Sequence, residues 1–124
     1  MAGCRTTSTV AAYSGPPKPD AELAILKGED ANLSVGFMAV WRAENLVLVR
    51  RLSPRSTGYP EELKLEPGQY IVKVQCVLGV LRATPVLAVT VARGNTYVVA
   101  CSHAGEKYEG ARAHLVRVDV HAPQ

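Results

Sequence analysis

The side chains best suited to chemistry stand in one short run, Cys101-Ser102-His103, the only place where a thiol and an imidazole are close in sequence. A structural zinc site needs about four ligands at known spacings, and the chain has neither Cys-x-x-Cys nor His-x-x-x-His. A Cys–His nucleophile needs an exposed thiolate of low pKa, whereas Cys101 belongs to an apolar, strand-like stretch. The pattern therefore predicts no metal, no cofactor and no covalent catalysis.

Acid–base catalysis is the next chemistry to consider. The adjacent carboxylates Glu61-Glu62 and Glu29-Asp30 lie in turn-like segments, which is typical of solvated surface. A glycine-rich phosphate-binding loop is missing. The sequence thus predicts a protein that is not an enzyme.

The charge pattern bears on partners. The 124 residues carry 14 basic and 11 acidic side chains, a net charge of +3, scattered along the chain. Nucleic-acid binders gather their basic residues on one face, so we expect no nucleic-acid partner. The densest basic group, Arg50, Arg51 and Arg55, brackets a predicted turn and is either a solvated rim or a contact for phosphate or anionic lipid.

The elements that would position these residues show the period of two that is typical of strands. In residues 70–76, Tyr70, Val72, Val74 and Cys76 share one face. The turn pair Pro67-Gly68 precedes this strand and residues 62–65 form its expected partner.

Three further strand regions complete the expected sheets. Residues 36–42 and 46–51 predict a hairpin with Phe37, Ala39 and Trp41 on one side, where a core role for Trp41 is favoured over a partner contact. Residues 86–102 predict a hairpin whose loop, Arg93-Gly94-Asn95, pairs Val91 with Tyr97, Val89 with Val99 and Leu87 with Cys101. This loop requires a left-handed conformation near Gly94 or Asn95. In residues 113–120 we expect an inward face of Val116, Val118 and Val120 and an outward face of Arg117 and Asp119.

Together with residues 21–26, these segments give about seven or eight short strands separated by turns. The predicted fold class is all-β, a small antiparallel β-sandwich or a partly open barrel. Residues 21–124 are expected to form this single domain, because 124 residues are too few for two ordinary ones.

The N-terminal residues predict a different role. Ala2-Gly3-Cys4 resembles the lipobox of bacterial lipoproteins, in which the cysteine is acylated and becomes the mature N-terminus. Residues 5–20 are rich in Thr, Ser, Ala and Pro and lack a strand or helix period. We therefore expect residues 1–20 to be a lipobox remnant and a flexible tether, with Cys4 as the lipidated residue; an ordinary frayed terminus is the alternative.

The chain has three cysteines, an odd number. If Cys4 is acylated, Cys76 and Cys101 remain as a pair on faces expected to be buried. They form either a disulfide closing a loop of about 25 residues or two buried thiols; a disulfide would fit an oxidising compartment.

Three segments resemble small Gram-negative lipoproteins that have a single β-sandwich domain. They are Tyr13-Ser14-Gly15-Pro16 with the run at 22–26, the Leu65-Glu66-Pro67-Gly68-Gln69-Tyr70 turn with Val72 and Val74, and Arg93-Gly94-Asn95-Thr96-Tyr97. The last two are also similar to hairpins of transthyretin-like and carbohydrate-binding-like sandwiches. The resemblance implies the fold and assigns no activity; Arg5 after the cysteine, where inner-membrane retention favours Asp, implies the outer membrane.

The sequence therefore predicts a non-catalytic envelope lipoprotein on the periplasmic side of the outer membrane, bound to the membrane through Cys4 and to an envelope protein or glycan. Two alternatives stay open: an inhibitor that inserts residues 102–110 into an enzyme cleft, or a cytosolic β-domain that starts at Met1. The expected partner contacts are Ser102, His103, Lys107, Tyr108, Arg50, Arg51 and Arg55.

Overall fold

The computed structural model describes residues 9–29, 35–54, 59–78, 81–103 and 111–120. Within these ranges the chain forms ten strands and one short 3-10 turn, η1 (Asp20–Glu22). The strands are β1 (Thr9–Ala11), β2 (Ala24–Gly28), β3 (Val35–Arg42), β4 (Leu48–Arg51), β5 (Glu62–Leu65), β6 (Gly68–Leu78), β7 (Leu81–Ala83), β8 (Val86–Val91), β9 (Asn95–His103) and β10 (Ala111–Val120).

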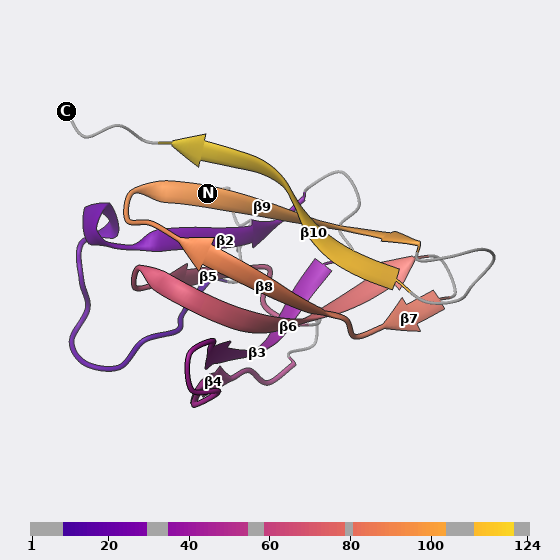
Figure 1. Ribbon diagram of the computed structural model, residues 1–124, viewed down its shortest axis with the longest axis horizontal. Helices are drawn as coiled ribbons and strands as arrows, with labels where there is room; N and C mark the ends of the chain where they lie inside the picture. The colour runs from indigo at the N-terminus through magenta and orange to yellow at the C-terminus, as the bar shows by residue number, and fades with distance from the viewer. Residues whose placement is uncertain (1–8, 30–34, 55–58, 79–80, 104–110, 121–124) are drawn as a thin grey trace, which may run out of the picture.

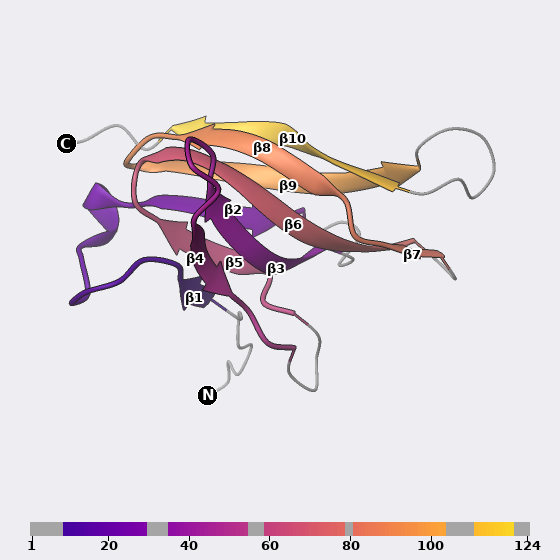
Figure 2. The ribbon, with the colours of Figure 1, turned by 60° about the horizontal axis from the view of Figure 1, so that its bottom comes forward.

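The strands form two sheets that pack face to face (Figures 1 and 2). Sheet 1 has the order β1-β5-β2-β9-β10, and sheet 2 has the order β4-β3-β6, with β7 and β8 both paired to the far side of the long strand β6. All pairs are antiparallel except β1–β5 and β2–β9. The predicted all-β sandwich is confirmed, and among the described strands no pairing closes it into a barrel.

The core lies between the sheets and follows the alternation of β6 and β5. Tyr70, Val72, Val74 and Cys76 are at most 1% exposed, as the period of two predicts. From sheet 1, Leu63, Leu65, Leu26 and Val99 meet them and are fully buried. Burial of these side chains is the main stabilising contribution of the fold.

The β3–β4 hairpin is confirmed, but the predicted shared face of Phe37, Ala39 and Trp41 is wrong. The β3–β6 register shifts between Phe37 and Ala39, so Met38 is an extra residue, a β-bulge. Because a bulge reverses the alternation, Phe37 and Val40 are buried inside, whereas Trp41 lies half-buried on the outer side. Trp41 is therefore not a core residue.

The predicted β8–β9 hairpin is also wrong. Val91 pairs with Gly68 of β6 instead of Tyr97, and β9 pairs with β2 and β10 in the other sheet. The chain crosses between the sheets at Gly94, whose φ of +80° is the left-handed conformation expected in this loop. The apolar faces of β8 and β9 still point inward, because the two strands belong to opposite sheets that enclose the same core.

A second crossing, made by Glu66 and Pro67, separates β5 from β6. The two strands therefore do not pair as predicted: β5 lies between β1 and β2 in sheet 1. Its partner residues there include Leu26, which stands opposite Leu63.

The face assigned to β10 needs a similar correction. A register shift between Leu115 and Arg117 makes Val116 a bulge, and β10 is an edge strand of sheet 1. Val116 is 44% exposed, and Ala113 and Leu115 pack against the core before the bulge. Val118 stands opposite the buried Tyr97, so it keeps the predicted inward side, but it is 45% exposed because β10 is at the sheet edge. The side chains of Arg117 and Val120 lie outside the described part of the chain.

Residues 9–20, expected to be a flexible tether, are held against the domain at Thr9–Ala12, Lys18 and Asp20, so that prediction is wrong for this part. β1 adds to sheet 1 by pairing in parallel with β5 (Thr9 opposite Glu62). Ala12 is 1% exposed, and its backbone N–H donates to the Lys64 carbonyl at 2.8 Å. We call residues 9–20 the N-terminal strap. The polar composition of the strap predicts no order, but its first three residues, Thr9–Ala11, form backbone hydrogen bonds with the edge of sheet 1 at β5. This pairing orders the strap.

Candidate functional site

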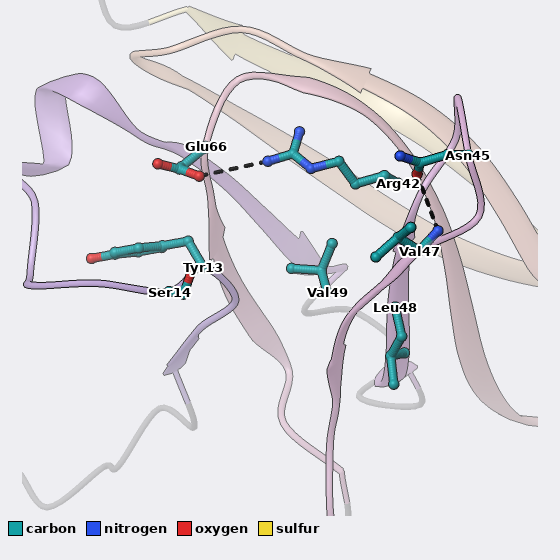
Figure 3. Close-up of a pocket in the computed structure, with 8 residues that line it drawn as sticks. All are labelled: Tyr13, Ser14, Arg42, Asn45, Val47, Leu48, Val49 and Glu66. Atoms are coloured by element: carbon teal, nitrogen blue, oxygen red, sulfur yellow. Dashed lines mark hydrogen bonds and ion pairs between the residues drawn. The ribbon is translucent and has the colours of Figure 1, made fainter.

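A groove of about 250 Å³ lies between the N-terminal strap and the β3–β4 hairpin (Figure 3). One wall is Tyr13 and Ser14 of the strap, and the other is the apolar run Val47, Leu48 and Val49. The remaining lining residues are Arg42, Asn45 and Glu66. The strap, which sequence reasoning treated as a linker, is therefore one wall of the candidate site.

Charged groups tie the two walls together at Glu66. Its carboxylate is paired with the Lys18 ammonium of the strap and lies 3.7 Å from an Arg42 guanidinium nitrogen. The Arg42 guanidinium also stands 5.5 Å from the centre of the Tyr70 ring. A second ion pair, Lys64 to Asp20 at 2.9 Å, holds the far end of the strap.

The hairpin turn presents its apolar side chains to solvent. Leu46, Val47 and Leu48 are 67%, 55% and 41% exposed. Leu46 has φ +56°, a conformation that costs a leucine free energy, and the Asn45 Oδ1 accepts a hydrogen bond from the Val47 N–H at 3.1 Å. The turn therefore holds apolar side chains outward at an energetic cost, which is typical of a binding surface.

Tyr70 is a buried core residue that contacts Glu66, one of the residues that line the groove. Its hydroxyl donates to the Glu66 carbonyl at 2.6 Å. Burial raises the pKa of Tyr70 above its ordinary value of 10.0; the Arg42 charge opposes this shift and the Glu66 charge adds to it.

We expect the free energy of unfolding to fall as the pH rises above about 10. There the unfolded chain loses the Tyr70 proton while the folded protein keeps it, because the folded pKa is the higher one. The contribution is complete below pH 10 and is lost as the pH rises through the folded pKa. Hydrogen bonds to Glu66 and Asp20 also raise the pKa values of Lys18 and Lys64, and these shifts lower the stability at high pH in the same way. Urea unfolding of the wild type and of Tyr70→Phe at several pH values therefore separates the contribution of the tyrosine from that of the lysines. Identical pH profiles would contradict the assignment.

Removal of residues 1–20 is expected to lower the free energy of unfolding by roughly 2 kcal/mol, the value of burying the Ala12 and Val10 side chains. Removal of residues 1–8 alone keeps every strap contact described above and serves as the control. Urea unfolding of both truncated chains tests this. Equal stability of the two would show that the strap does not contribute to the fold.

The structure brings some of the predicted contact residues to this region and not others. Arg50 and Arg51 lie on β4, and the Arg50 guanidinium donates to the Ala11 carbonyl at 3.0 Å, which joins the hairpin to the strap. Ser102 and His103 end β9 in the other sheet. Cys4, Arg55, Lys107 and Tyr108 lie outside the described residues. The groove residues Tyr13, Arg42 and Glu66 were not predicted; the exposed apolar run at 46–48 was the available signal.

Cys76 of β6 and Cys101 of β9 are joined by a disulfide, with their Cα atoms 5.8 Å apart. Of the two alternatives left by the sequence, the structure therefore has the disulfide rather than two thiols. Since β6 belongs to sheet 2 and β9 to sheet 1, the bond links the sheets through the core.

The described ranges hold no group of three or more His, Cys, Asp or Glu that could bind a metal ion. No helix among them has the length and apolarity needed to cross a membrane.

The structure is a disulfide-linked, two-sheet β-sandwich with a groove at one edge. No family model matches the chain, and comparisons with curated proteins and with solved structures also gave no match.

Proposed function

We propose that the protein is a non-catalytic lipoprotein of the bacterial envelope, anchored at Cys4 and binding another envelope component through the groove. The observation that carries this proposal is the Cys76–Cys101 disulfide, because such bonds persist in oxidising compartments such as the periplasm. With these two cysteines paired, Cys4 is the remaining thiol, and it follows Ala2-Gly3 as a lipidated cysteine would.

The packed strap changes the geometry of this anchor. A tether of sixteen residues would allow the domain to move far from the membrane, but β1 starts at Thr9. Five peptide steps separate Thr9 from Cys4 and span at most about 17 Å. A lipid on Cys4 would therefore keep the strap edge of the sandwich, and with it the groove, close to the bilayer.

The groove supports binding rather than catalysis. Its apolar wall and its neutralised Glu66 suit an apolar or extended ligand with a few polar groups, supplied by an envelope protein or glycan. β4 borders the groove and is an edge strand of sheet 2, so an extended segment of a partner can also add to the sheet there.

Membrane fractionation with mass spectrometry of the N-terminal peptide tests the proposal. The gene is expressed together with the DNA that precedes it in a Gram-negative bacterium. We expect Cys4 to carry a diacylglyceryl group in the outer-membrane fraction, and Cys4→Ser to release the protein from that fraction. An unmodified chain that starts at Met1 and stays in the cytosol would contradict the proposal.

A further inference from the structure

The outer face of sheet 2 carries a continuous apolar row. Leu48, Trp41, Ile71 and Ala88 stand directly opposite one another across β4, β3, β6 and β8. Residues paired in this way lie on the same face, and Ile71 alternates with the buried Tyr70 and Val72, so the row faces outward. The only tryptophan of the chain is at its centre.

A second row beside it combines basic and apolar side chains. Arg51, Ala39, Lys73 and Val86 are paired across the same four strands. Val86 is 62% exposed, Arg51 is exposed and Lys73 is partly exposed, whereas Ala39 between them is 3% exposed. We call these eight residues the sheet 2 face.

Charge separates this sheet from the rest of the molecule. The strands of sheet 2 contain five basic residues and no Asp or Glu. All 11 acidic residues of the chain therefore lie outside these strands, including Glu44 in the turn between β3 and β4, and Glu62 and Asp119 in strands of sheet 1. The five basic residues are Arg42, Arg50, Arg51, Lys73 and Arg82.

The described elements form two layers, and no third layer of them covers the sheet 2 face (Figure 2). The exposed turn residues Leu46 and Val47 follow the same β3–β4 hairpin and add to its apolar surface. A face that joins a tryptophan, aliphatic side chains and cations without carboxylates is complementary to an anionic lipid surface.

We propose that the sheet 2 face lies on an anionic phospholipid bilayer, with Trp41 at the level of the headgroups and the Arg51 and Lys73 charges among the lipid phosphates. This inference rests on the proposed envelope location and names the membrane as a direct partner of the folded domain. A lipid on Cys4 and the sheet 2 face can contact the same bilayer, although β1 belongs to sheet 1. The two sheets pack about 10 Å apart, and the segment from Thr9 to Cys4 spans up to about 17 Å. β1 also lies beside β4, since Arg50 donates to the Ala11 carbonyl.

Vesicle binding by the unacylated full chain tests the face without the anchor. Cys4→Ser protein is mixed with vesicles of phosphatidylglycerol and phosphatidylethanolamine, or of phosphatidylcholine alone. Because Trp41 is the only tryptophan, its fluorescence reports on this face. We expect a shift to shorter wavelength and quenching by brominated acyl chains with the anionic vesicles, and neither change with phosphatidylcholine.

Charge-removal variants locate the contact. Arg51→Gln with Lys73→Gln is expected to weaken binding to anionic vesicles roughly twenty-five-fold, about a factor of five for each cation. Lys27→Gln with Arg93→Gln also removes two positive charges, but outside the sheet 2 face, and is expected to weaken binding to anionic vesicles by less than about threefold.

Equal weakening in the two pairs, or vesicle binding that leaves the Trp41 emission unchanged, would overturn the proposal, since another surface or net charge alone would then account for binding. Binding of a protein through this face without any lipid interaction would overturn it as well. A chain without acylation at Cys4 in cells would contradict the proposed lipid anchor and not the proposed membrane contact of the sheet 2 face, so the two proposals are tested separately.

Discussion

Reduction of the Cys76–Cys101 disulfide is expected to lower the free energy of unfolding by about 3.5 kcal/mol. The two cysteines are 25 residues apart, and closing a loop of this length removes that much chain entropy, at 25 °C, from the unfolded state. The loss is a large fraction of the net stability of a small domain. Urea unfolding with and without a thiol reductant measures it.

The double variant Cys76→Ala with Cys101→Ala provides the control for this experiment. It should have the stability of the reduced wild type or less, because it also loses two buried sulfur atoms, and it should not respond to reductant. A wild-type stability that is the same with and without reductant would show that the bond does not link the sheets.

Phe37→Ala is expected to cost about 3–5 kcal/mol, the range for removing a fully buried phenylalanine. Phe37 is the only phenylalanine of the chain and is 0% exposed between the sheets. The substitution leaves a cavity that the paired strands cannot easily close, because their register fixes the backbone on both sides. Urea unfolding provides the measurement.

Trp41→Ala is the matched comparison, since it removes a larger ring from the same strand. The Met38 bulge places Trp41 on the outer, half-buried side, so we expect less than half the loss seen for Phe37→Ala. Equal losses would mean that Phe37 and Trp41 share the core face, as simple alternation predicts, and that the bulge is absent.

Local patterns predicted those parts of the fold that depend on neighbours in sequence. The inward face of β6, the β3–β4 hairpin and the left-handed residue at Gly94 follow from alternation and turn chemistry alone. Their matching faces also placed Cys76 and Cys101 together in the core, but left open a disulfide or two thiols, and only the structure has the disulfide.

Alternation could not show where the chain changes sheet. The apolar faces of β8 and β9 are buried in the same core in two arrangements: as paired strands of one sheet, or as strands of two facing sheets joined at Gly94. The alternation is the same in both, so it does not distinguish them. The choice depends on β6, which is long enough to pair with both β7 and β8 and so takes β8 into sheet 2. Likewise, the bulges at Met38 and Val116 leave no sequence signal but reverse the faces that follow them.

The candidate site was harder to predict than the fold. The groove joins Tyr13 to Val47 and Glu66, which are distant in sequence and meet because β1 pairs with β5. The strap has the composition of a linker, so only its tertiary contacts show that it is part of the domain. The rows of the sheet 2 face likewise depend on the strand order and on the Met38 bulge.

Thiol trapping in intact cells tests the central claim, that this protein works in the envelope, most directly. Cells that express the gene with its preceding DNA are quenched with acid and treated with an alkylating reagent, and the cysteine peptides are analysed by mass spectrometry. The account predicts that Cys76 and Cys101 are recovered as one disulfide-linked pair without alkylation. Recovery of both as alkylated thiols would place the chain in a reducing compartment and contradict the account.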